Sequence, residues 1–258
     1  MDRDVERPAA MLLVAATVCL VCSLVVSAAA VLLRPRQLAN QARERTQKVA
    51  DILAGVPGMA DLVGGMDVAG LDVRVVELST GAYADAMDAG AYDQRTAAAD
   101  PARSVALPAE RDLAGLGRRA RWATVYLARA PDGSVGLVIL PVHGQGFASM
   151  LYGYLALDGD GVTVRGLSFY EQGETPGLGA EVASPEWLAA WRGKRVRDAS
   201  GRIVVRVATG AAVSEYEVDG IAGATWTGKG VTSLLRFWLG ADGFGPFLER
   251  LAAEGAGR

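Results

Sequence analysis

The chain has 258 residues, 51% of them hydrophobic, which is enough for one or two domains with a packed core. Its formal net charge of −3 argues against a nucleic-acid-binding protein, because surfaces that bind nucleic acid are basic. Its only cysteines, Cys19 and Cys22, form a C-x-x-C pair inside an apolar stretch. We interpret them as buried small residues rather than as iron or redox ligands shared with a neighbouring subunit.

The N-terminal part contains a segment long enough to cross a membrane. No charged residue interrupts positions 9–33, and a bilayer core of about 30 Å needs roughly 20 apolar residues. The small residues at 27–30 also fit a signal-peptide cleavage site, but Asp2, Asp4 and Glu6 and the length of the stretch favour a retained anchor. We therefore predict a short tail at 1–8, one transmembrane helix at 9–33 and a soluble domain at 34–258.

The charges that flank this segment give its local orientation signal. Arg3 and Arg7 precede it, whereas Arg34, Arg36, Arg43, Arg45 and Lys48 follow it. Because positive charges favour the cytoplasmic side, this count alone places the large C-terminal domain in the cytoplasm.

The next elements alternate helical and strand-like patterns. Apolar residues recur near a period of 3.6 over 37–54, which predicts an amphipathic helix, and 71–75 alternates like a half-buried strand. The Ala-rich segment 81–108 shows no period and is predicted to be irregular, wrapping the surface or meeting a partner subunit.

Two hairpins and several helices follow. The strand-like runs 122–129 and 135–142 flank a Pro-Asp-Gly turn, and the runs 154–157 and 162–169 flank an Asp-Gly turn. Ser184 and Pro185 predict a helix start, as N-cap and first helical residue. A strand is expected over 202–207, and a last helix is expected to open at Thr227 or Gly228. The pattern predicts an α+β fold of antiparallel sheets with peripheral helices.

The segment 219–228, Asp-Gly-Ile-Ala-Gly-Ala-Thr-Trp-Thr-Gly, is the strongest candidate for a binding site. Its glycines and alanines let a ligand approach the backbone, and the apolar run that follows predicts a helix whose N-terminus favours a phosphate. Thr225 is the candidate for a covalent link. The alternative is a glycine-rich helix start in which Thr225 or Thr227 acts only as the N-cap.

Residues 219–225 resemble the flavinylation motif Asp-x-x-(Ser/Thr)-Gly-Ala-Thr, except that Ala222 replaces the hydroxyl residue. Further segments extend the resemblance over nearly the whole chain: 92–95, 100–101, 144–147, 150–153, 169–171, 174–179, 236–240 and 243–246. With these segments the chain resembles the NqrC family, which are subunits of sodium-translocating NADH:quinone reductases. The short motif is also shared with Rnf-complex subunits and nitrous-oxide regulators.

The resemblance implies a covalent FMN joined to Thr225 by a phosphoester bond. It assigns Asp219 to recognition by the flavin transferase, near the metal and pyrophosphate of the FAD donor. The implied FMN contacts are Glu174, Thr175, Gly177, Leu178, Gly179, Gly223, Ala224 and Thr227, with 144–152 lining the same pocket. A plain turn is the alternative for 174–179. Tyr170 is predicted either to stack on the flavin or to belong to the core. We expect attachment to survive despite Ala222.

The sequence gives little support for other classes of enzyme. His143 is the only histidine and no serine sits in a nucleophile elbow, which argues against a serine hydrolase, so we interpret His143 as structural. No clustered His, Cys or carboxylate ligands predict a metal site outside the apolar stretch. No G-x-G-x-x-G motif follows a strand, and NADH is therefore expected to bind another subunit.

The implied function is electron transfer from NADH to ubiquinone coupled to sodium export. The implied partners are the other subunits of a six-subunit complex, the flavin transferase transiently, and membrane lipid. The implied location is the bacterial inner membrane, single-pass, with a periplasmic domain, opposite to the local charge count. Two alternatives stay open: the G subunit of an Rnf-type ferredoxin:NAD complex, and a membrane-anchored assembly module without a cofactor.

Overall fold

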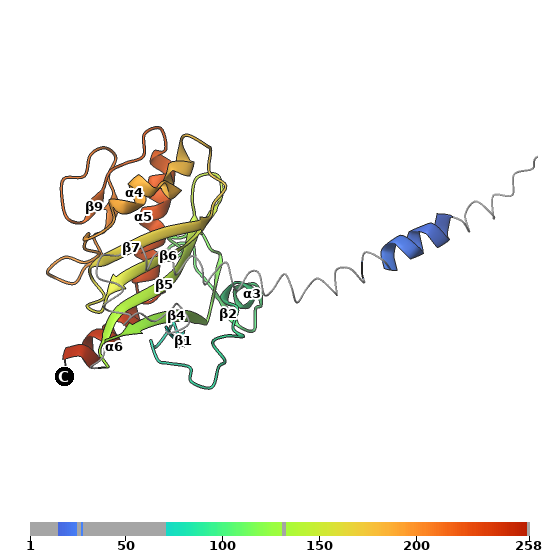
Figure 1. Ribbon diagram of the computed structural model, residues 1–258, viewed down its shortest axis with the longest axis horizontal. Coiled ribbons are helices and arrows are strands. Elements are labelled where there is room, and N and C mark those ends of the chain that lie inside the picture. Colours follow the sequence, from blue (N-terminus) through green and yellow to red (C-terminus); the bar gives the residue numbers. More distant parts are fainter. Residues whose placement is uncertain (1–14, 25–26, 28–70, 131–132, 257–258) are drawn as a thin grey trace, which may run out of the picture. The chain divides into compact units, whose positions relative to one another are not determined.

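The structure is a computed structural model that describes residues 15–24, 27, 71–130 and 133–256 (Figure 1). The chain divides into two compact units, Met1–Gln47 and Lys48–Arg258. In the first unit, residues 15–24 are helical. Within the described ranges, no helix combines the length and apolar character that a membrane span requires. Much of the predicted membrane helix at 9–33, and all of the amphipathic helix predicted over 37–54, lie outside the described residues.

A five-stranded sheet forms the centre of the second unit (Figure 1). Its strand order is β1-β4-β5-β6-β7, and all neighbouring strands are antiparallel. The strands are β1 (Asp72–Glu77), β4 (Trp122–Arg129), β5 (Val135–Gln145), β6 (Met150–Asp158) and β7 (Val164–Glu171). The strand at 71–75 and the two hairpins are thereby confirmed.

The central strands are buried on both faces of the sheet. Successive side chains of a strand point to opposite faces, and β5 accordingly sends Val138, Leu140 and Val142 into one hydrophobic cluster. Leu137 and Ile139 belong to a second cluster. Because each face of β5 is lined with apolar side chains, the sheet has a core on both sides.

The helix α5 (Thr225–Leu239) packs on β5 in the first of these clusters, close to the sheet (Figure 1). Glycines make this close contact possible. A Cβ on Gly230 would lie 2.6 Å from the backbone oxygen of Gln145, and a Cβ on Gly144 would lie 3.0 Å from Cβ of Leu234. The helix is therefore held near the end of β5, where the candidate site lies.

Smaller elements surround this core. They are α3 (Gln94–Ala99), β2 (Ser104–Ala106), β3 (Arg118–Ala120), η2 (Gly179–Ala183), α4 (Pro185–Ala189), β8 (Arg206–Val207), β9 (Glu217–Val218) and α6 (Gly245–Ala256). Ser184 caps α4 by accepting from the amide of Trp187, with Pro185 as the first helical residue, which confirms that prediction. The antiparallel sheet with peripheral helices confirms the α+β class, and the transmembrane helix of that prediction remains untested.

Three predictions about elements were wrong. The segment 81–108 is not irregular throughout: α3 begins after Asp93, whose carboxylate accepts from the amide of Thr96 at 2.7 Å, and β2 follows it. The strand expected over 202–207 is confined to β8, because the amides of Val204 and Val205 both turn toward the oxygen of Val196.

The start of α5 is the third correction. The helix begins at Thr225, before the predicted start at Thr227 or Gly228. A turn precedes the helix. In this turn the amide of Ala224 donates to the backbone oxygen of Ile221, and Gly223 adopts a φ of 70°. This turn allows Ala224 to accept from Gly228, so the helix starts inside the small-residue segment.

Candidate functional site

A pocket of about 130 Å³ lies between the start of α5, the loop after β7 and the loop after β5. It is lined by Phe147, Glu174, Thr175, Leu178, Gly179, Gly223, Ala224, Trp226 and Thr227. The structure thus brings together most of the predicted FMN contacts from two segments far apart in the sequence. Of the predicted site residues, Gly177, Asp219 and Thr225 are not among the lining residues.

Thr225 is nevertheless placed at the edge of the pocket. It is exposed, it is the first residue of α5, and its chain neighbours Ala224 and Trp226 both line the pocket. In the described structure no side chain caps the first turn of α5. The first amides of a helix have no partner within the helix, so this turn offers donors to an anion next to the Thr225 hydroxyl.

Glycine keeps the two loops of the pocket in contact. Gly223 has a φ of 70°, which favours glycine, and a Cβ there would lie 2.7 Å from Cδ2 of Leu178. A larger residue at 223 would therefore both strain the backbone and push the 174–179 loop away from the start of α5.

Three large apolar side chains remain exposed around the pocket. Phe147 and Trp226 are 65% and 64% exposed, and Leu178 is also exposed. Nζ of Lys229 lies 4.4 Å from the centre of the Trp226 ring, within the range of a cation–π contact. This apolar rim suits a planar aromatic ligand, because flat rings bind well against aromatic and aliphatic surfaces.

The wall of the pocket contains a buried carboxylate, that of Glu174, which is only 5% exposed. It accepts from the hydroxyl of Thr227 at 2.6 Å and from the amides of Ala148 and Ser149 at 2.9 and 3.0 Å. Burial alone would raise the pKa of Glu174, but these hydrogen bonds outweigh it and hold the pKa below its ordinary value.

The hydroxyl of Thr227 has a partner that the sequence did not predict, the carboxylate of Glu174. Its side chain is 1% exposed and its hydroxyl donates to Glu174, so it does not cap the helix. It lines the pocket by its position in the second half of the first turn of α5. The N-cap of α5 is Ala224, and the alternative in which Thr225 or Thr227 acts as the N-cap is wrong.

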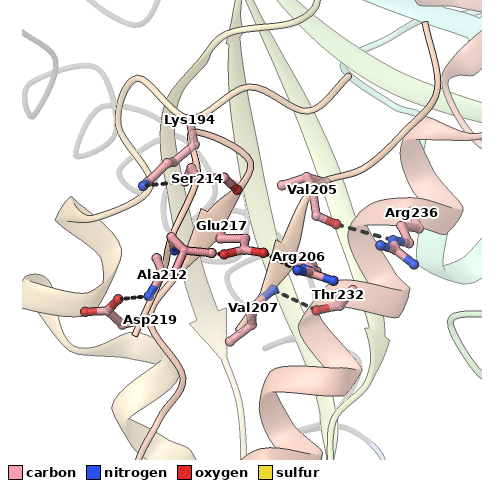
Figure 2. Close-up of polar contacts among 11 residues, drawn as sticks. Lys194, Val205, Arg206, Val207, Ala212, Ser214, Glu217, Asp219, Thr232 and Arg236 are labelled. Atoms are coloured by element: carbon pink, nitrogen blue, oxygen red, sulfur yellow. Dashed lines mark hydrogen bonds and ion pairs between the residues drawn. The ribbon is translucent and has the colours of Figure 1, made fainter. Parts of the chain in front are cut away.

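Asp219 lies outside the pocket, in the loop that leads to α5. Its carboxylate accepts from the amide of Ala212 at 2.6 Å, as Figure 2 shows, and its backbone oxygen accepts from the indole of Trp187 at 2.9 Å. Ala222 is exposed in the same loop. One oxygen of the Asp219 carboxylate thus holds the loop.

The β8–β9 pair connects this loop to α5 (Figure 2). The amide of Val207 donates to the hydroxyl of Thr232 on α5 at 2.9 Å, and Arg206 donates to the carboxylate of Glu217. Glu217 in turn accepts from the amide of Val213 at 2.9 Å. These contacts tie the loop ahead of Thr225 to the middle of α5.

His143 and Tyr170 both lie outside the pocket lining. The His143 ring stacks on Tyr152 with centroids 5.4 Å apart and lies 4.8 Å from Trp238, so the structural interpretation of His143 is confirmed. Burial, with a smaller effect of the Arg95 charge, lowers the pKa of His143 to about 4. The ring of Tyr170 lies 5.3 Å from that of Tyr154, centroid to centroid, and Tyr170 is partly buried against the second core cluster, which favours the core alternative.

Sequence reasoning did not single out Phe147 or Trp226 as pocket residues. Phe147 falls within 144–152, which was expected to line the pocket as a segment, and the apolar character of Trp226 next to Thr225 was the available signal. Nothing in their local pattern separates an exposed aromatic from a buried one.

Comparison with known proteins assigns the chain to a family. The FMN-binding domain family matches residues 146–240, which contain the whole pocket and α5. The chain is 47% identical over 253 residues to the NqrC protein of the Na(+)-translocating NADH-quinone reductase of Pseudomonas aeruginosa, covering 95% of this chain and 97% of that protein. The chain belongs to the NqrC family of Na(+)-translocating NADH-quinone reductase subunits.

Other members of the NqrC family agree with this assignment. The protein of Neisseria meningitidis is 38% identical over 258 residues, covering 98% of each chain. The crystal structure of Shewanella oneidensis NqrC superposes with a TM-score of 0.72 at 31% identity, covering 83% of this chain and 99% of that chain. The corresponding protein from Parabacteroides distasonis gives a TM-score of 0.61 at 29% identity, covering 84% and 96%. The resemblance found in the sequence is confirmed, and the protein is a subunit of an oxidoreductase complex.

Proposed function

We propose that this chain carries FMN, bound covalently through Thr225, and passes electrons within a complex that oxidises NADH, reduces ubiquinone and exports sodium. The observation that carries the proposal is the exposed residue Thr225 at the uncapped start of α5, directly beside an apolar-rimmed pocket. The FMN-binding family match over 146–240 supports the cofactor.

Attachment uses FAD as the donor and needs a flavin transferase. A bond forms between Oγ1 of Thr225 and the phosphorus on the FMN side of the pyrophosphate, the pyrophosphate bond breaks, AMP leaves and the hydroxyl proton is lost. Asp219 supports this step as the acidic residue of the attachment loop, near the metal and pyrophosphate of the donor. Ala222 replaces a hydroxyl residue in an exposed position, and attachment does not depend on it.

The residues of the pocket hold the attached group. The first-turn amides of α5 and the helix dipole favour the phosphate, and Lys229, one turn after Thr225, offsets its charge. Leu178, Phe147 and Trp226 cover the ring faces, and Thr175 with the backbone of Gly179 meets the polar edge. The flavin, when bound, accepts and donates electrons, and the protein fixes its position and its environment.

The remaining assignments concern the membrane. We place the chain in the bacterial inner membrane through a single span at 9–33, with residues 34–258 in the periplasm. This placement puts Thr225 in the compartment where the family's transferase works. The arginines that follow residue 33 favour the opposite orientation, with the domain in the cytoplasm. The partners are the other subunits of a six-subunit complex, the transferase transiently, and lipid.

Denaturing gel electrophoresis tests the covalent link. The full chain is coexpressed with the flavin transferase as wild type, Thr225→Ala, Thr225→Ser and, as a control, Thr209→Ala, which alters another exposed threonine of a loop. We expect fluorescent bands for wild type and the control, none for Thr225→Ala, and a band for Thr225→Ser because a hydroxyl remains. A dark wild-type band, or a band that persists in Thr225→Ala, overturns the proposal.

A further inference from the structure

The Glu174 carboxylate joins three segments of the pocket. It accepts from the amides of Phe147, Ala148 and Ser149 at 3.3, 2.9 and 3.0 Å, and from the hydroxyl of Ser149 at 3.3 Å. The hydroxyl of Thr227 on α5 adds the shortest contact, 2.6 Å. One side chain therefore ties the 174–179 loop both to the loop after β5 and to the start of α5.

Two glycines show how tightly the carboxylate is enclosed. A Cβ on Gly146 would lie 2.6 Å from Oε1 of Glu174, and a Cβ on Gly179 would lie 2.7 Å from Oε2. Real Cβ atoms do not come this close, so the backbone at both positions touches the carboxylate directly. The hydroxyl of Ser149 extends the cradle by accepting from the amide of Gly173 at 2.7 Å.

The donors around Glu174 require an anion. A carboxylate only accepts, and each of its oxygens meets N–H or O–H groups. A glutamine would turn an NH₂ group toward at least one of these donors and leave it without a partner. Since the same hydrogen bonds also keep its pKa low, the group is ionised at neutral pH.

We propose that Glu174 is a positioning residue that sets the shape of the pocket and, as a buried negative charge in its wall, lowers the reduction potential of the FMN held there. The inference rests on the proposed function. Reduction adds negative charge to the ring system, and a fixed anion in a weakly polar wall opposes that addition. The role differs from the predicted one, in which Glu174 is a direct contact of the cofactor.

Redox titration of the flavinylated full-length chain in detergent measures the potential. For Glu174→Gln we expect the ratio of reduced to oxidised flavin at a fixed potential to rise about tenfold, which is roughly 30 mV for a two-electron couple. The matched control is Glu181→Gln, which neutralises an exposed carboxylate on η2 a few residues away. We expect the control to titrate as wild type does.

A second variant separates charge from loss of packing. Thr227→Val keeps the shape of the side chain and removes the hydroxyl that offsets the charge of Glu174. We expect its potential to move in the opposite direction, below that of wild type, because the carboxylate is retained with one donor fewer. General loosening of the pocket would move both variants the same way. If the Glu174→Gln protein does not accumulate, the potential of Thr227→Val alone tests the inference. A Thr227→Val potential equal to or above that of wild type overturns it.

The contribution of Glu174 to the structure of the pocket can be measured without the cofactor, as a change in unfolding temperature. In the full chain expressed without the transferase, we expect Glu174→Gln to lower the unfolding temperature and Glu181→Gln to leave it unchanged. A flavin-free wild type after coexpression refutes the proposed function, whereas this unfolding comparison still tests the role of Glu174. A flavinylated Glu174→Gln protein with the potential of wild type refutes the inference and leaves the proposed function standing.

Discussion

Asp219 has two separable properties, the hydrogen bond that its carboxylate accepts and the charge that it carries. The carboxylate accepts from the amide of Ala212, and that contact holds the loop ahead of Thr225 (Figure 2). An asparagine can accept from the same amide through its side-chain oxygen, but it lacks the charge that the proposed function uses near the metal and pyrophosphate of FAD. The two functions therefore respond differently to substitution.

We predict that Asp219→Asn unfolds within about 0.5 kcal/mol of wild type and acquires FMN more slowly. Asp219→Ala loses both properties, and it is expected to be less stable by about 1 kcal/mol as well as slow to acquire FMN. Denaturant unfolding measures the first quantity, and gel fluorescence during a timed reaction with the transferase measures the second. Labelling of Asp219→Asn at the wild-type rate would show that the carboxylate acts only by holding the loop.

His143 makes stability depend on pH. Its pKa falls from the ordinary 6.5 to about 4 in the folded protein because the ring is buried and, to a smaller extent, because Arg95 is nearby. Between these two values the unfolded chain binds more protons than the folded one, so stability is lost as the pH falls from 6.5 toward 4. The shift corresponds to at most about 3 kcal/mol.

The measurement is denaturant unfolding at several pH values for wild type and His143→Phe. Phenylalanine keeps an aromatic ring on Tyr152 and removes the titration. We expect the loss of stability between pH 6.5 and 4 to be smaller in His143→Phe by up to about 3 kcal/mol. Equal losses in the two proteins would show that His143 contributes nothing to the pH dependence.

At the scale of elements, the contact between α5 and β5 determines where Thr225, the proposed attachment residue, lies. Replacing a helical glycine with alanine normally stabilises a helix by about 1 kcal/mol. At Gly230 the new Cβ would lie 2.6 Å from the backbone oxygen of Gln145, which cannot move without shifting β5. The steric cost therefore exceeds the gain in helix propensity.

We predict that Gly230→Ala destabilises the protein by about 1–3 kcal/mol and lowers the extent of flavinylation. Gly210→Ala is the matched control, because a Cβ at Gly210 would meet nothing within 4 Å. Denaturant unfolding of both variants gives the comparison. A Gly230→Ala protein as stable as wild type would mean that α5 can move away from β5 at little cost.

Elements were predictable where neighbouring residues determine them. The hairpins follow from alternation and from Asp-Gly turns, and α4 follows from Ser184 and Pro185. By contrast, β8 pairs in parallel with β9, eleven residues further along, and its length depends on where Val196 accepts hydrogen bonds. Contacts between distant residues of this kind leave no local period in the sequence.

At the scale of the whole molecule, the sequence predicted which segments form the site but not the hydrogen bonds that connect them. The family motifs identified 174–179 and 219–225, and the structure brings residues of both segments together around one pocket. The hydrogen bond from Thr227, just after the second segment, to Glu174 in the first has no spacing in the sequence that reveals it. Thr227 was therefore predicted as an FMN contact, or as the helix cap in the alternative, and its support of the carboxylate in the pocket wall was not predicted.

The local charge count and the family resemblance predict opposite orientations of the chain in the membrane. The proposed function places residues 34–258 in the periplasm, whereas the arginines after residue 33 favour the cytoplasm. Chemical labelling of introduced cysteines distinguishes the two orientations. The labelling is specific because Cys19 and Cys22 are the only native cysteines and can both be changed to alanine. In that background, Val213→Cys gives a thiol at a position that is 86% exposed, and Asp4→Cys gives one ahead of the predicted span.

We expect a maleimide that cannot cross the inner membrane to label Val213→Cys in intact cells, and to label Asp4→Cys only after the cells are permeabilised. The reason is that a single span places the two positions on opposite sides, and the transferase must reach Thr225 from the side of Val213. The Cys-free parent controls for labelling elsewhere. The reverse pattern would put Thr225 in the cytoplasm and require attachment there, whereas labelling of both positions in intact cells would contradict a single span.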